Sequence, residues 1–410
     1  MADHPAPASV RWRSGLAAWL GWMFDGLDMH LYTLVALPLV AHLLGDLATS
    51  DPAVRSTSSW IQAAFLAGWA LGGAFFGILG DRLGRSRTLV LTILTYAIFT
   101  GMGYLAETWW QLAIFRFLAA LGIGGEWAVG AALLAESWPT TWRPWLAAIL
   151  QSAVNVGIML ATLAGYLLAG FPPETVFLVG LLPAVITLWI RKAVPETEAW
   201  SDAQAHQPPP PVTALWQRSL RRVTATSLVV CGLLLTAHWA FMFWYVQHLR
   251  TLAEAAGWDV AQRSKLASLA LLVVMVASIV GNFTAAWCAH RFGWRKTVAA
   301  MALTYAGLVW WGFGVPRTLD AIWPFLAAIG VCQGLFALFT MYLPPLFPTL
   351  LRTTGAGLCY NAGRLAAAAG TVLFAMALPL GDVRMALVWA AVLFVPGALL
   401  VLTLPEEGAP

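Results

Sequence analysis

The stretch WLGWMFDGLDMHLYTL, residues Trp19–Leu34, places two carboxylates, Asp25 and Asp28, in a run otherwise apolar enough to cross a lipid bilayer. An ionised side chain at membrane depth is costly, and it is tolerated mainly where it faces a wet cavity or a partner. The spacing of three residues puts both acids on one face of a helix, close enough for their titrations to couple. We therefore expect a proton-coupling pair, with Asp28 leading and Asp25 assisting.

The whole chain has the composition of a membrane protein. It has 410 residues, of which 60% are hydrophobic and 10% charged, and its mean hydropathy is +0.75. In soluble globular proteins about a quarter of the residues are charged, so a soluble globular protein is excluded. Apolar runs of about twenty residues fit spanning helices and not the shorter transmembrane strands. The four dispersed cysteines predict neither a disulfide framework nor a metal site, and no signal peptide or nucleic-acid partner is indicated.

The apolar runs predict an all-α polytopic protein with twelve transmembrane helices. A proline-rich stretch divides them into two sets of six, which predicts a first six-helix bundle at 1–190, a cytoplasmic linker at 191–222 and a second bundle at 223–410. The expected spans are 16–43, 59–80, 88–106, 109–135, 145–170, 174–191, 223–249, 266–289, 297–314, 321–343, 354–379 and 384–404.

The basic residues predict the orientation in the membrane. With both termini inside, fifteen Lys and Arg fall in cytoplasmic segments and six fall outside. Because cytoplasmic loops carry the excess of positive charge, this indicates a multi-pass protein of the cytoplasmic membrane with both termini in the cytoplasm. Two arginines, Arg116 and Arg364, remain within spans.

An internal repeat relates the two halves at an offset of 209 residues. The segment DRLGRSR at 81–87 is answered by HRFGWRK at 290–296, and Pro139 and Arg143 are answered by Pro348 and Arg352. Two parallel six-helix halves with a site between them near the midplane are typical of transporters.

Four motifs carry a resemblance to a known family. GILGDRLGRSR, RFLAALGIGGEW, AESWPTTWR and PETEAW resemble the signature elements of the major facilitator superfamily. Within it, DGLD, ESWP and LWIRKAVPETEAW are most similar to the proton-linked sialic acid and monocarboxylate transporters, with aromatic-acid symporters close behind. The resemblance implies proton-coupled uptake of a small organic anion by alternating access, with the proton as coupling ion and no other cofactor.

The motifs also predict a gate at the cytoplasmic side. In the loop DRLGRSR, Gly84 permits a tight turn and the basic residues hold the cytoplasmic surface. Just before this loop, a small-residue face for close helix packing is offered by Gly68, Gly72, Gly73 and Gly77. His290 and Pro345 replace the acids expected in the second half, so we expect a weaker charge relay there. The alternative is a basic loop that only sets topology. The gating set is Asp81, Arg82, Gly84, Arg85, Glu136, Arg143, Arg291 and Arg352.

Three charged residues within spans are candidates for the site itself. Glu126 either carries a proton or serves as a structural partner of an arginine. Arg116 either neutralises an acid of the first span, binds a substrate carboxylate, or extends to the outer interface. Arg364 is the first candidate for holding the anion, because Asn155 stands at its repeat position; its alternative is an ion pair with helix ends.

Neutral polar residues within spans complete the predicted binding set. The alternative for each of these residues is an ordinary hydrogen bond between helices, without contact to a substrate. The monocarboxylate transporters have a histidine in the seventh span, as here, but the rest of their polar motif is absent. The set is Asn361, His238, Gln151, Asn155 and Tyr32.

Two other functions remain open. One is a proton-driven exporter of drugs or neutral metabolites on the same machinery, and the other is a metabolite sensor that moves nothing. Phosphate-loop, dinucleotide and nucleophile-elbow motifs are missing, so we expect no enzyme. A six-plus-six chain is expected to function as a monomer in the bilayer.

Overall fold

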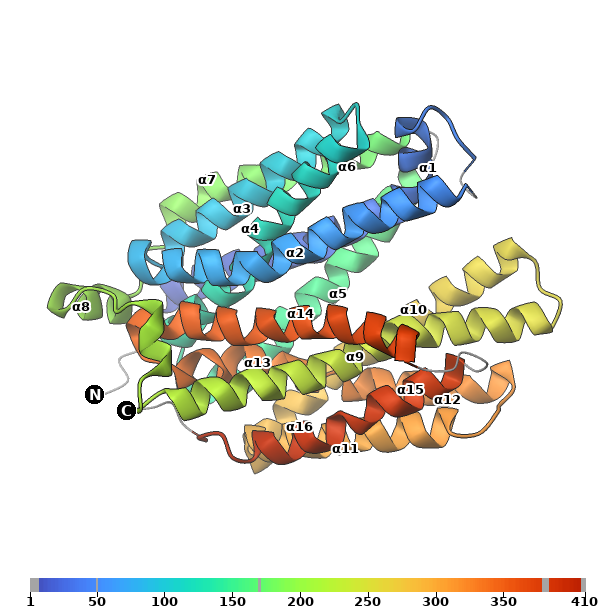
Figure 1. The fold of residues 1–410 in the computed structure, drawn as a ribbon. Coiled ribbons are helices and arrows are strands. Elements are labelled where there is room, and N and C mark those ends of the chain that lie inside the picture. Colours follow the sequence, from blue (N-terminus) through green and yellow to red (C-terminus); the bar gives the residue numbers. More distant parts are fainter. Residues whose placement is uncertain (1–6, 49–50, 169–170, 378–382, 407–410) are drawn as a thin grey trace.

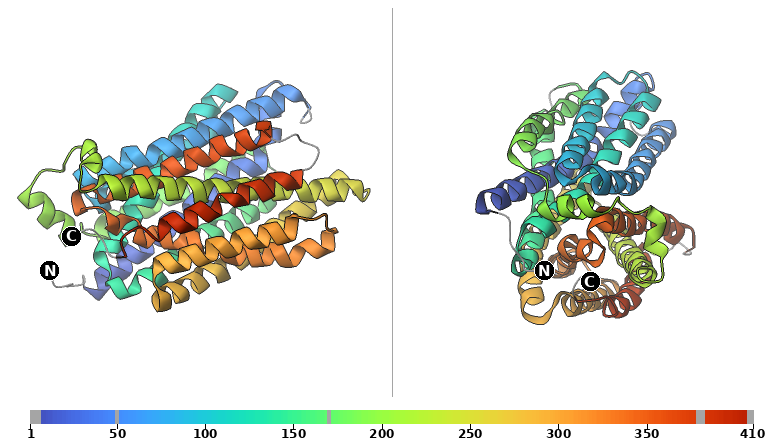
Figure 2. Two further views of the ribbon diagram at one scale, coloured as in Figure 1. Left: turned by 60° about the horizontal axis from the view of Figure 1, so that its bottom comes forward. Right: turned by 90° about the vertical axis from the view of Figure 1, so that its left-hand side faces the viewer.

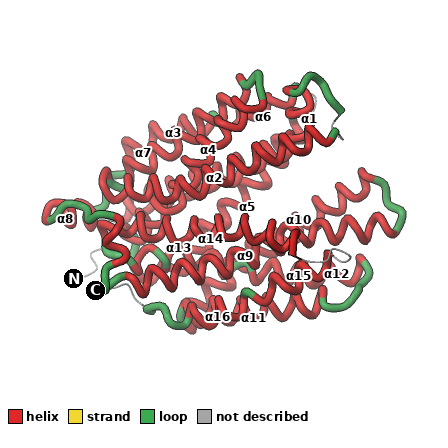
Figure 3. The backbone as a smooth tube through the Cα atoms, in the orientation of Figure 1, coloured by secondary structure: helices red, strands yellow, loops and turns green. Residues whose placement is uncertain are grey.

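The fold consists of helices and connecting segments. A computed structural model describes residues 7–48, 51–168, 171–377 and 383–406, and it contains no strand within these ranges (Figure 3). Eight helical stretches of the described chain are long and apolar enough to cross a membrane, and the bent α1 (Ala8–Leu43) makes a ninth. The expected all-α membrane fold is therefore confirmed.

The helices fall into two sequential sets joined by a short connecting helix. The first set is α1, α2 (Pro52–Leu83), α3 (Arg85–Met102), α4 (Trp109–Ser137), α5 (Arg143–Leu167), α6 (Val176–Val179) and α7 (Leu182–Ala193). The connecting helix is α8 (Glu198–His206). The second set is α9 (Arg221–Ala255), α10 (Val260–Phe292), α11 (Trp294–Phe313), α12 (Leu319–Cys332), α13 (Leu335–Tyr342), α14 (Arg352–Ala377), α15 (Val383–Val392) and α16 (Phe394–Val401).

The two sets form two bundles that lie side by side (Figure 1 and Figure 2). The start of α1, the end of α16 and helix α8 lie at one end of the molecule, which we call the terminal end (Figure 1). Two helix pairs connect the bundles. At one, Thr353 Oγ1 of α14 donates to Gly77 O of α2 at 2.6 Å, and at the other, Asn155 Nδ2 of α5 donates to Met275 O of α10 at 3.2 Å. The internal repeat relates these two pairs.

Three of the expected spans are interrupted rather than continuous. The range 174–191 is split into α6 and α7 around Gly180, 321–343 into α12 and α13 at Gln333, and 384–404 into α15 and α16 at Leu393. Helix α1 bends by 53° between Tyr32 and Val35. Pro38 lies in the same helix, where it removes a backbone hydrogen bond one turn earlier and so favours the bend. The last residues of 145–170 and 354–379 lie outside the described residues.

Candidate functional site

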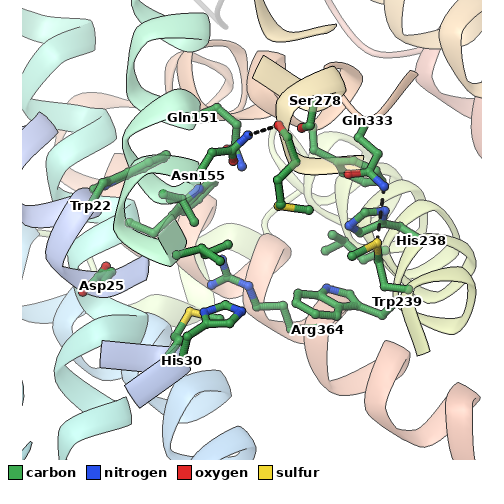
Figure 4. A pocket seen from close by; sticks show the side chains of 18 of the residues that line it. Trp22, Asp25, His30, Gln151, Asn155, His238, Trp239, Ser278, Gln333 and Arg364 are labelled. Carbon is green, nitrogen blue, oxygen red and sulfur yellow. Dashed lines mark hydrogen bonds between the residues drawn. The ribbon is translucent and has the colours of Figure 1, made fainter. Parts of the chain in front are cut away.

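A cavity of about 170 Å³ lies between the two bundles. Figure 4 shows Asp25 on the first-bundle side and Arg364 projecting from the second. Most of the wall is apolar or aromatic, and the polar groups are few. The polar and charged lining residues are Asp25, His30, Gln151, Asn155, His238, Ser278, Gln333, Tyr360 and Arg364. A mostly apolar wall with a few polar groups is typical of a small-molecule site.

The guanidinium of Arg364 is held between two aromatic rings. Its Cζ lies 4.0 Å from the ring centroid of Trp69 and 4.7 Å from that of Tyr360. Nη1 donates to Oδ1 of Asn361 at 2.8 Å, and no carboxylate lies within 4.0 Å of this arginine among the described residues. The two rings flank the guanidinium, and N–H groups other than the one bonded to Asn361 can donate to a planar anion in the cavity.

Asp25 shares its surroundings with a second buried acid. The carboxyl of Glu126 occupies the space that a side chain at Gly21 would fill, since a Cβ there would lie 1.6 Å from Glu126 Oε1. Gly21 is one turn before Asp25 on α1, and the two carboxyl groups are neighbours. Within the described part of the chain, neither acid has a basic nitrogen within 4.0 Å, although the charge of Arg364 reaches Asp25, and the buried oxygens of Glu126 have Asp25 as their titratable neighbour.

Asp28 points to a different partner. Arg116 Nη1 lies 3.1 Å from its Oδ2, both side chains are 1% exposed, and Thr100 Oγ1 donates to its Oδ1. This pair joins α1, α3 and α4 within the first bundle and does not line the cavity. The arginine therefore does not extend to the outer interface, and it neutralises an acid of the first span. The two acids of the predicted pair therefore face different partners, since Asp28 contacts Arg116 and Asp25 lines the cavity, although the charge of Asp28 still reaches Asp25.

The other predicted binding residues divide into two groups. Gln151, Asn155 and His238 line the cavity, as expected of a binding set. Asn361 and Tyr32 do not. Asn361 accepts a hydrogen bond from Arg364, and the Tyr32 hydroxyl donates to Ser58 O at 3.3 Å, with the Tyr32 ring 5.5 Å from Cζ of Arg116.

The aromatic walls were predicted only in part. The sequence suggests Trp239, Phe241 and Trp244 as an apolar wall for a larger organic acid, and of these Trp239 lines the cavity and the other two do not. The rings of Trp127 and Tyr360 stack with centroids 4.1 Å apart, and Trp69 meets Trp239 edge to face at 6.2 Å. Each stack joins one bundle to the other. The available signal was the presence of tryptophans in the middle of spans, where they cannot anchor at a headgroup level.

At the terminal end, a buried charge cluster links the bundles. Arg85 contacts Glu136 at 2.8 Å and Asp81 at 3.0 Å, while Arg352 of the second bundle contacts Glu136 at 2.9 Å. Asp81 also accepts the backbone N–H of Thr354 at 2.8 Å, at the start of α14. A carboxylate at a helix N-terminus is favoured by the exposed N–H groups and the helix dipole.

The connector after α7 supports this cluster from outside. Oε2 and Oε1 of Glu196 accept the N–H groups of Ser86 and Arg87, each at 3.0 Å, at the start of α3. Gly84 precedes this helix with φ +104°, and a Cβ there would lie 2.5 Å from the Glu196 carboxyl. A side chain at Gly84 would therefore be strained and would displace the carboxylate.

The corresponding region of the second bundle is more exposed. Arg295 pairs with Glu406, and their side chains are 29% and 42% exposed, but this contact stays within the second bundle. Arg291 and Arg82 are exposed, and Arg143 is half-buried at the start of α5. The buried cluster that crosses between the bundles is built from first-bundle acids, as the replacements by His290 and Pro345 predict.

Comparisons with known proteins agree with this arrangement. The family model of the Major Facilitator Superfamily matches residues 16–371. A probable 4-methylmuconolactone transporter of Cupriavidus pinatubonensis is 32% identical over 90% of this chain and 84% of its own length. The sialic acid transporter NanX of Escherichia coli is 26% identical over 87% of this chain and 85% of its own. The E. coli fucose:proton symporter FucP superposes with a TM-score of 0.75 at 14% identity, covering 97% of this chain and all of that one.

Proposed function

This chain belongs to the major facilitator superfamily of membrane transporters, and we propose that it takes up a small planar organic carboxylate together with a proton. The observation that carries the proposal is the cavity-facing arginine, Arg364, stacked between Trp69 and Tyr360 with no carboxylate partner in the described chain. An unpaired arginine at membrane depth is expensive, so a site that keeps one is suited to receive an anion.

The cavity favours a flat, unsaturated or aromatic acid over a flexible polar one. Aromatic side chains of both bundles form its walls, and the guanidinium edge offers two parallel donors to a carboxylate. The names of similar proteins support an organic-acid cargo, including a muconolactone and sialic acid.

Asp25 and Glu126 form the proposed proton site. Two buried carboxylates side by side repel each other, which favours a state in which one of them holds a proton. Asp25 also faces the cavity that contains Arg364, so protonation and anion binding affect the same space. Asp28 is reassigned from proton carrier to structural partner of Arg116.

We propose that the terminal end lies on the cytoplasmic side of a plasma or inner membrane, because basic residues are in excess there. The buried cluster of Arg85, Glu136 and Arg352 then closes the cytoplasmic side, and the structure corresponds to a conformation shut on that side. One chain contains the whole cavity, which supports function as a monomer.

The test is transport by purified protein in proteoliposomes. Uptake of benzoate, cis,cis-muconate, lactate and sialic acid is measured with and without an imposed pH gradient. We expect gradient-driven uptake of a planar carboxylate, lost in Arg364→Gln. Asp25→Asn should abolish driven uptake while exchange of labelled for unlabelled substrate continues. Driven uptake that survives Asp25→Asn unchanged would contradict the proton site, and transport indifferent to Arg364→Gln would favour the export of neutral or cationic compounds.

A further inference from the structure

A continuous line of contacts joins the cavity to the charge cluster along α2 and α14. On α2 the contacting residues are Trp69, Gly73, Gly77 and Asp81, spaced by four and therefore on one helix face. They span about 18 Å at 1.5 Å per residue. Each meets a residue of α14, which belongs to the other bundle. Gly68 and Gly72 face a different way, onto backbone carbonyls of α4.

At the cavity end of this line, α2 holds the anion-facing arginine in place. The Trp69 ring covers the guanidinium of Arg364 at 4.0 Å. One turn along, Gly73 leaves room for Asn361, since a Cβ at Gly73 would lie 1.7 Å from its Nδ2. Asn361 in turn accepts the hydrogen bond from Arg364 and donates to Gly357 O at 2.9 Å.

At the other end, the same two helices form the closed gate. A Cβ at Gly77 would lie 2.8 Å from Thr353 O, and Thr353 Oγ1 donates to Gly77 O. Asp81 then accepts the N–H groups of Thr353 and Thr354 at 3.3 and 2.8 Å. The two backbones approach closely at Gly77, so we expect that parting α2 and α14 at the gate also loosens their contacts nearer the cavity.

We propose that Trp69 and Gly73 are positioning residues that make anion binding conditional on closure of the terminal gate. They belong to the first bundle, whereas Arg364 belongs to the second, so the complete anion site exists only while α2 and α14 are together. Opening the gate moves the Trp69 ring away from the guanidinium of Arg364 and removes the contact that holds Asn361. The affinity of the site for the anion then falls, and the anion is released on that side. This inference rests on the proposed role of Arg364.

Linkage makes the proposal measurable, because a ligand that binds the closed state better must also favour closure. Benzoate is the probe, with equilibrium binding and hydrogen exchange at the Thr353 and Thr354 amides measured on the purified full chain. In the wild type we expect benzoate to slow exchange at these amides. Gly73→Ala should weaken benzoate binding about tenfold and remove this slowing. Gly73 does not line the cavity, so a direct contact with benzoate does not explain such a loss.

Gly307→Ala is the matched control, because a Cβ at Gly307 meets nothing within 4 Å. If Gly73→Ala does not fold, Trp69→Leu replaces it. Because Trp69 also lines the cavity, the readout is then exchange at Thr353 and Thr354 with benzoate at saturation, where Trp69→Leu should remove the slowing and Trp69→Phe, which keeps a ring beside the guanidinium, should retain much of it. The inference is overturned if benzoate binds and is transported but leaves exchange at Thr353 and Thr354 unchanged, or if a folded Gly73→Ala protein binds like the wild type. If no carboxylate of the transport panel binds the wild type, the proposed function itself is overturned.

Discussion

Replacing Arg352 by glutamine should open the terminal gate without disturbing either bundle. Its Nη1 bonds to Glu136 Oε1 at 2.9 Å, and this is the side-chain ion pair that crosses from the second bundle to the first in the described chain. The partner acid keeps Arg85 in the variant, so it is not left as a lone buried charge. The change therefore acts on the contact between bundles rather than on the folding of one of them.

The magnitude follows from the burial of the pair. The Glu136 side chain is 0% exposed and that of Arg352 is 17% exposed, so solvent screens the contact only weakly. A hydrogen bond to a charged group contributes about 1.5 to 3 kcal/mol. Since each 1.4 kcal/mol changes an equilibrium about tenfold, Arg352→Gln should raise the population of the open gate by a factor of about 10 to 100, with the partial exposure favouring the lower value.

Hydrogen exchange at the Thr353 and Thr354 amides reports this opening, because their acceptor Asp81 lies across the gate. We expect exchange there to accelerate by the same factor, with protection in the middle of α4 unchanged. The matched control is Arg295→Gln, whose ion pair is exposed, lies within the second bundle and contributes about 0 to 1 kcal/mol. Equal exchange in Arg352→Gln and the wild type, or equal acceleration in both variants, would refute the assignment of the gate.

Three further predictions concern contacts of the first bundle. Asp28→Asn leaves a buried arginine without its anion and should destabilise the protein by about 3 to 5 kcal/mol, measured as a lower melting temperature; lost coupling at unchanged stability would instead restore Asp28 as a proton carrier. Gly21→Ala should displace the carboxyl of Glu126 and abolish gradient-driven uptake. Adding Glu126→Asp, whose side chain is shorter, should restore part of that uptake. Full uptake by Gly21→Ala alone would contradict the close packing of Glu126 over Gly21. Gly84→Ala forces an alanine into a backbone region that is essentially restricted to glycine, at a cost of about 1 to 3 kcal/mol, and it also collides with the Glu196 carboxylate. Combining it with Glu196→Ala should therefore lower the melting temperature by less than the sum of the two single changes, and strict additivity would count against the cap at Glu196.

The sequence predicted the fold because membrane insertion leaves a visible pattern. Apolar runs of spanning length, separated by loops, are read directly from residue types, and the repeat at 209 residues relates Arg143 to Arg352 without any structure. The interruptions at Gly180 and Leu393 were missed, since local breaks in a helix depend on packing against neighbours and leave the apolar run unbroken.

The candidate site was predicted in its composition and only partly in its arrangement. Arg364, His238, Gln151 and Asn155 line the cavity as expected, because a polar residue in an apolar span needs a reason to be there. Spacing along one helix suggested that Asp25 and Asp28 act together, but it gave no information on which neighbouring helix each one faces.

By itself, the sequence determined that this is a two-fold helical membrane protein with a few charges inside it, since hydrophobicity and repetition are properties of the chain. Only the tertiary structure decided the partners of those charges. Arg116 contacts Asp28, Glu126 lies over Gly21 beside Asp25, and Arg364 lies between two aromatic rings with no carboxylate within 4.0 Å among the described residues. Pairing is decided by distances of about 3 Å between residues far apart in the chain, and such distances exist only once the helices have packed.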